Sequence, residues 1–258
     1  MQEILLKYHP VPRLPFCFRV RGKFPASWEE LTPRQLVALS GLSERDSLHR
    51  LVHRFTGIPR GICRCMDLYQ LSRIWWLSDW ISASGSLDRF IIPRIPAGGN
   101  VLCSPCPGLR KVTFGQFVFF DTCYIRYAES KSPQDLDRFV ASLYLPEGAA
   151  FSDELPLTLE PFAEKIPPKI KQAVLFNYTL VRRWLAGIYP LLFALPEDEN
   201  QPDEKRKTAP KADPSVWIKV FENLVGDDIT RHEEYGRIPL HNVLRFLTTR
   251  TKENIKTR

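Results

Sequence analysis

Four of the six cysteines have spacings that metal sites use. Cys103-Ser-Pro-Cys106 has the two-residue gap of half a zinc site, and Cys63-Arg-Cys65 would supply the other half. A Cys-x-Cys pair is not the usual partner spacing, however, and no Cys/His pair follows at the distance seen in zinc fingers. The sequence therefore favours reduced, buried or partly buried cysteines, with a zinc site as the alternative.

A second set of candidates combines the histidines and arginines of residues 45–73 with the rings of Tyr69, Trp75 and Trp76. His49 and His53 are one helical turn apart and would either face one metal ion or lie as polar residues on an exposed edge. The arginines and rings of this stretch would form a surface for single-stranded nucleic acid. Alternatively, the arginines face solvent and the rings fill the core, or a tryptophan is presented to a protein partner. The residues concerned are Arg50, Arg54, Arg60, Arg64, Arg73, Tyr69, Trp75 and Trp76.

The sequence contains no motif for catalysis or nucleotide binding. Gly98-Gly99 lacks the Lys-Ser/Thr that follows a phosphate-binding loop, and is predicted to be a turn. Neither a G-x-S-x-G elbow nor an H-E-x-x-H helix occurs. We therefore predict a protein that is not an enzyme, and we assign no catalytic, cofactor-binding or metal-binding residue.

The elements that must position these residues form a mainly α fold. The clearest pattern runs from Pro167 to Leu192, where apolar residues recur at three- and four-residue steps, and it predicts the central core helix. Helices are also expected where Thr32 and Thr113 are each followed three residues later by glutamine, as in a capping box. Further predicted helices cover residues 43–57, 66–83, 132–145, 216–224 and a segment that begins at Pro239. Residues 58–65, 93–110 and 149–166 are predicted loops, the last with a single helical turn near Glu160.

At most one short two-stranded β element is expected, which pairs residues 16–20 with residues 90–95. The predicted organisation is a helical body over residues 1–195, a flexible charged linker over residues 196–213 and a C-terminal helical pair over residues 214–258. The linker is rich in charge and proline and lacks aromatic and β-branched aliphatic residues, so it cannot bury enough surface to offset its ordering entropy.

The charge balance narrows the choice of partners without deciding it. The chain carries 36 basic and 29 acidic residues, a net charge of +7, which permits contact with nucleic acid or with an acidic protein surface. No secretion signal is visible, and the apolar uncharged run of residues 184–196 is shorter than the roughly 20 residues of a membrane span. We therefore expect a cytoplasmic protein without a membrane partner.

Several segments, taken in order, resemble one family. They are FPASWEELTPRQLVAL, LRKVTFGQFVFFDTCYIRYAES, DRFVASLYLPEG, KIKQAVLFNYTLVRRWLAGIYPLLF, the charged linker, WIKVFENLVGD and IPLHNVLRFL. This order is similar to that of tail-module proteins of about this size from phages and prophages of Bacteroidota. The chain departs from the family at Leu145, where an arginine is usual, and in the Cys103–Cys106 loop.

The resemblance implies a function in tail assembly. Genes of this family tend to lie among tail-tube and tape-measure genes, a position often held by tail assembly chaperones. The implied partners are tape-measure, tube or baseplate proteins, bound in the host cytoplasm or within the virion tail. The alternative is a nucleic-acid-binding accessory protein that uses the basic–aromatic surface and the basic C-terminal tail. The oligomeric state is not predicted.

Overall fold

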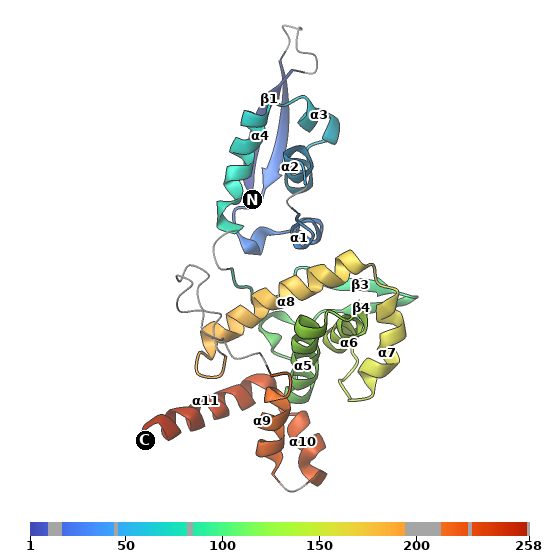
Figure 1. Cartoon of the computed structure of the whole chain (residues 1–258), viewed down its shortest axis with the longest axis vertical. Helices are drawn as coiled ribbons and strands as arrows, with labels where there is room; N and C mark the ends of the chain where they lie inside the picture. Colours follow the sequence, from blue (N-terminus) through green and yellow to red (C-terminus); the bar gives the residue numbers. More distant parts are fainter. Residues whose placement is uncertain (10–16, 44–45, 82–84, 194–212, 227–228, 257–258) are drawn as a thin grey trace. The chain divides into compact units, whose positions relative to one another are not determined.

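A computed structural model describes residues 1–9, 17–43, 46–81, 85–193, 213–226 and 229–256 (Figure 1). The chain divides into two compact units, residues 1–87 and residues 88–258. Among the described residues, no helix combines the length and the apolar composition that crossing a membrane requires.

Residues 1–87 combine an antiparallel ribbon of two strands with short helices (Figure 1). The elements are β1 (Gln2–Tyr8), β2 (Phe18–Phe24), η1 (Trp28–Glu30), α1 (Pro33–Ser40), α2 (Leu48–Thr56), α3 (Arg60–Arg64), α4 (Leu68–Trp75) and η2 (Trp76–Ile81). Thr32 caps α1 with a complete capping box, in which the Thr32 hydroxyl accepts from Gln35 N and the Gln35 side chain accepts from Thr32 N. The helix start expected at Thr32 is therefore confirmed.

The inner face of the ribbon is held against α2. Side chains of a strand alternate between its two faces, and the buried residues of β2 are Gly22 and Phe24. A Cβ atom at Gly22 would lie 2.9 Å from the side chain of Ile58, in the loop after α2, and 3.2 Å from Thr56 Cβ at the end of α2, so the strand approaches the end of the helix closely there. The Phe24 ring stacks on the Phe55 ring, with the ring centroids 5.7 Å apart. Because a ribbon of two strands is marginally stable by itself, this packing is what keeps it folded.

Residues 88–258 form a helical unit with a small three-stranded sheet, in the order β3-β4-β5. The strands are β3 (Arg94–Ala97), β4 (Asn100–Cys103) and β5 (Leu145–Pro146). The helices are η3 (Pro107–Leu109), α5 (Phe114–Ser130), α6 (Pro133–Leu143), α7 (Leu155–Glu164), α8 (Pro168–Ile188), α9 (Val216–Val225), η5 (Ile229–Arg231), α10 (His232–Gly236) and α11 (Leu240–Lys256).

The long helix α8 is the core element of this unit and crosses α5 and α6 (Figure 1). Tyr178 on α8 is fully buried, and its ring contacts Phe120, Tyr124 and Phe139 with ring centroids 5.0–5.3 Å apart. Its hydroxyl donates to Asp121 Oδ1 over 2.5 Å, and burial raises the pKa of Tyr178 well above its usual value. The predicted core helix is confirmed in place, but it runs from Pro168 to Ile188 and does not reach Leu192.

Ion pairs link α8 to α5 and to α6 inside this unit. Arg182 Nε donates to Asp121 Oδ1 over 3.0 Å. Lys171 and Asp137 form a buried ion pair between α8 and α6. Since losing one partner of a buried pair leaves an uncompensated charge, these contacts fix how α5, α6 and α8 pack.

The mainly α prediction is confirmed, but the limit of one two-stranded β element is wrong, because there are two sheets. β2 pairs with β1 rather than with residues 90–95, since the adjacent strand lies closest along the chain. Residues 94–103, predicted to be an irregular loop, form the β3–β4 hairpin. Its turn is Gly98-Gly99 at φ +55° and +93°, left-handed conformations that glycine adopts readily.

Three helix boundaries also differ from the prediction. Residues 60–64 are helical where a loop was expected, and Leu155–Glu164 is a full helix rather than a single turn. The helix expected over residues 66–83 ends at Trp75 and continues as the 3₁₀ helix η2. Ser78 Oγ donates to the Trp75 carbonyl at this change. A serine that bonds to the backbone in this way competes with the α-helical pattern.

The predicted linker, residues 196–213, lies outside the described residues except for Asp213. The boundary between the two compact units lies between Leu87 and Asp88, which is inside the predicted helical body of residues 1–195. The predicted C-terminal module, residues 214–258, belongs to the same compact unit as residues 88–193. The reason is aromatic packing, because Trp217 on α9 contacts Phe117 on α5 with ring centroids 4.9 Å apart.

Substituting Gly22 tests the packing of the ribbon. We expect Gly22→Ala to lower the free energy of unfolding by about 1–3 kcal/mol, because the new methyl group overpacks against Ile58 and Thr56. Chemical denaturation measures this change. The matched control is Gly61→Ala on α3, where an added Cβ meets nothing within 4 Å. Equal stability of the two variants would contradict the described packing.

Candidate functional site

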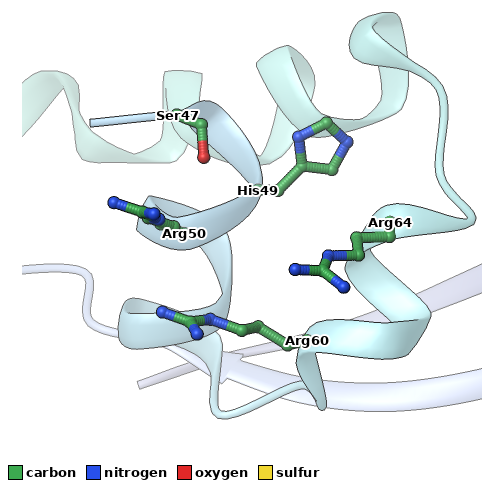
Figure 2. Close-up of a pocket in the computed structure, with 5 residues that line it drawn as sticks. All are labelled: Ser47, His49, Arg50, Arg60 and Arg64. Atoms are coloured by element: carbon green, nitrogen blue, oxygen red, sulfur yellow. The ribbon is translucent and has the colours of Figure 1, made fainter. Parts of the chain in front are cut away.

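A pocket between α2 and α3 is lined by basic side chains. Its volume is about 190 Å³, and its lining residues are Ser47, His49, Arg50, Arg60 and Arg64. Figure 2 shows Arg60 and Arg64 extending from α3 toward the start of α2, where Ser47 is the N-cap residue and His49 and Arg50 lie in the first turn. The structure thus brings together three of the five arginines of the predicted basic–aromatic surface.

The loop between the two helices sets this geometry. Gly57 ends α2 in a left-handed conformation at φ +74°, which suits a residue without a side chain. His53 Nδ1 donates to the Ile58 carbonyl over 2.6 Å, and Ile58 itself is buried. The chain then enters α3, where Arg60 and Arg64 are four residues apart and lie on the same side of the helix.

The three arginines of the pocket are available to a ligand. No carboxylate of the described residues forms an ion pair with Arg50, Arg60 or Arg64, whereas Arg54 pairs with Asp46 over 3.4 Å. Guanidinium groups match the geometry of phosphate and carboxylate oxygens, with which they form paired hydrogen bonds. The start of α2 adds the positive end of a helix dipole. The pocket is therefore suited to an anionic group such as a phosphate.

A face of α4 exposes large apolar side chains in the same unit. Leu68, Tyr69 and Trp76 are 67%, 66% and 63% exposed, and the Arg73 guanidinium lies 5.9 Å from the centre of the Tyr69 ring. We call Leu68, Tyr69, Arg73 and Trp76 the α4 face. Trp75, by contrast, points inward and meets Phe55 edge to face with ring centroids 5.4 Å apart. Of the three rings in the predicted basic–aromatic surface, Tyr69 and Trp76 are therefore exposed to solvent, while Trp75 packs against Phe55.

The candidate metal ligands are not brought together. Within the described parts of the chain, no group of three or more His, Cys, Asp or Glu side chains lies close enough to hold a metal ion. His49 lines the pocket. His53 is hydrogen-bonded through Nδ1 to the Ile58 carbonyl, and its Nε2 lies 3.5 Å from Arg34 Nη2. Cys63 and Cys65 belong to residues 1–87, and the pair Cys103 and Cys106 belongs to residues 88–258.

The thiols of the candidate zinc pairs differ in exposure. Cys63 is buried, and burial raises the pKa of its thiol. Cys65 is exposed, and its Sγ donates to the Gly61 carbonyl over 3.2 Å. Cys103 is half-buried and Cys106 is exposed. Each pair therefore has one cysteine that is more buried than the other. The exposure of the cysteines thus gives no support to the hypothesis that they bind zinc.

Sequence reasoning missed a row of cations on the ribbon. Lys7 on β1 and Arg19, Arg21 and Lys23 on β2 are all exposed and occupy its outer face. The signal was present in the segment FRVRGKF, where basic residues recur at every second position. This is the period of a strand with one solvent-facing side.

Comparisons of the chain with protein-family models, with curated proteins and with solved structures found no match. The resemblance to phage tail-module proteins and the function that it implies stay predictions.

Proposed function

We propose that this chain is a non-enzymatic binding protein of a phage or prophage tail module, which docks on a tail protein through the α4 face. The order of the resembling segments supports the tail assignment. The observation that carries the docking surface is the exposure of Leu68, Tyr69 and Trp76, each above 60%. Contiguous exposed apolar side chains mark interaction sites, and tryptophan and tyrosine are enriched among residues that dominate binding energy.

The α4 face also indicates what kind of partner it fits. Arg73 is exposed and lies between the two aromatic residues in the sequence, over the ring of Tyr69. A partner segment that supplies apolar side chains together with a carboxylate would satisfy both parts of this surface. An amphipathic helix laid along α4 is the simplest such partner.

Affinity purification of the full chain from a producing host tests this proposal. We expect Trp76→Ala combined with Tyr69→Ala to lower recovery of a tape-measure, tube or baseplate protein about tenfold or more, because truncating such anchors costs about 2 kcal/mol or more. Phe246→Ala on α11 is the matched control, since Phe246 is 55% exposed in the other unit. Recovery of no tail protein by the unmodified chain would contradict the proposal.

A second candidate function is binding of single-stranded nucleic acid through the arginine pocket. The convergence of Arg50, Arg60 and Arg64 favours it, because phosphates pair with cations along a strand. The exposed rings of Tyr69 and Trp76 would offer stacking surfaces for bases.

A salt titration with a labelled single strand tests the second candidate. We expect Arg60→Gln combined with Arg64→Gln to weaken binding and to reduce the slope of log affinity against log salt by about 1.4, or about 0.7 for each lost phosphate contact. Arg126→Gln combined with Lys169→Gln removes the same charge from exposed positions of the other unit. Equal binding by the pocket variant and this control would dismiss the pocket as a nucleic-acid site.

A further inference from the structure

The outer face of the β1–β2 ribbon is a row of cations. In the strand register, Lys7 lies opposite Arg19, Leu5 opposite Arg21, and Glu3 opposite Lys23. All six side chains are exposed. No carboxylate of the described residues forms an ion pair with any of the four cations. We call Lys7, Arg19, Arg21 and Lys23 the ribbon row.

This arrangement costs stability. Like charges directly opposite each other on paired strands are destabilising, and Lys7 faces Arg19 in this way. Leu5 is 57% exposed in the middle of the row, where a polar residue would be the ordinary choice for a solvent-facing position. Glu3, opposite Lys23, is the single acidic residue among the outward positions of the two strands, whereas a surface that only had to be solvated would carry the two signs of charge more evenly.

The unit of residues 1–87 as a whole also has an excess of positive charge. Residues 1–87 hold 12 Lys and Arg against 7 Asp and Glu, which gives them +5 of the chain's net charge of +7. Residues 88–258 hold the other 24 basic and 22 acidic residues, a net charge of +2. The ribbon row therefore belongs to the unit that attracts polyanions more strongly for its size.

The dimensions of the ribbon fit duplex DNA. The major groove, about 12 Å wide, admits a two-stranded ribbon, whose strands lie about 4.8 Å apart. Outward side chains on one strand are about 6.8 Å apart, and phosphates of one DNA strand follow one another at about 3.4 Å along the axis. Arg19, Arg21 and Lys23 therefore form one line of cations along β2 that can run beside the phosphates of one DNA strand, while Leu5 on β1 is placed for apolar contact with thymine methyl groups.

We propose that the ribbon row binds double-stranded DNA, with the ribbon laid into the major groove. The inner face of the ribbon is packed on α2, so the outer face is the one that meets the duplex. This goes beyond the proposed tail function and uses a surface different from both the α4 face and the arginine pocket. A duplex presents phosphates in lines, at about one negative charge per 1.7 Å of axis, which matches a row of cations better than the scattered carboxylates of an acidic protein or the flat surface of an anionic membrane.

Fluorescence anisotropy with a labelled duplex of about two helical turns tests the proposal on the full chain. The ribbon variant is Arg19→Gln, Arg21→Gln and Lys23→Gln. The control variant, Lys111→Gln, Arg126→Gln and Lys169→Gln, removes the same charge from exposed positions of the other unit. Circular dichroism and thermal unfolding verify that both variants remain folded, and the pocket variant with Arg60→Gln and Arg64→Gln is measured beside them.

We expect the ribbon variant to bind the duplex about tenfold or more weakly at low salt, with the salt slope reduced by about 2.7, or 0.9 for each lost phosphate contact. The control and pocket variants should keep most of the duplex affinity. Equal loss in the ribbon and control variants, loss only in the pocket variant, or no duplex binding by the unmodified chain would each overturn the proposal. So would a ribbon variant impaired only on phosphatidylserine vesicles.

Discussion

The contact between β2 and α2 is the constraint on which the unit of residues 1–87 depends. Two strands alone bury too little to stay paired, so the ribbon folds only where one of its faces meets a helix. The absence of a side chain at Gly22 allows Ile58 to approach, and Phe24 stacks on Phe55. Since strand side chains alternate, burying this face turns the intervening residues to solvent. The cationic outer face is thus a direct consequence of where the core lies.

The fold could be predicted where one local pattern decided it. The long apolar periodicity of α8 and the Thr32–Gln35 capping box each specify a helix without help from distant residues. The β3–β4 hairpin was missed, although Gly98-Gly99 was correctly identified as a turn, because four-residue strands are too short to show an alternation. The partner of β2 was wrong because pairing is a long-range property, which composition near residues 90–95 could not decide.

The candidate site was only partly predictable, for a similar reason. The sequence indicated that several arginines lie between residues 45 and 73. Which of them line one pocket depends on where α2 ends and α3 begins, and the sequence pattern did not predict the helix α3. Gly57 and the buried Ile58 turn the chain so that Arg60 and Arg64 face α2, while Arg54 is taken by Asp46. The sequence did not decide whether the tryptophans lie in the core or on the surface. The α-helix ends at Trp75 and the 3₁₀ helix begins at Trp76, and of the two only Trp76 is a large exposed side chain.

The central claim is that the outer face of the ribbon is a binding surface because its inner face is committed to the core. Backbone amide spectra of the full chain, recorded while a DNA duplex is added, test this claim most directly. If the outer face binds the duplex, shift changes concentrate in residues 3–7 and 19–23, while the amide signals of Thr56 and Ile58 change little. Changes confined to residues 88–258, or spectra unaffected by a saturating duplex, would contradict it.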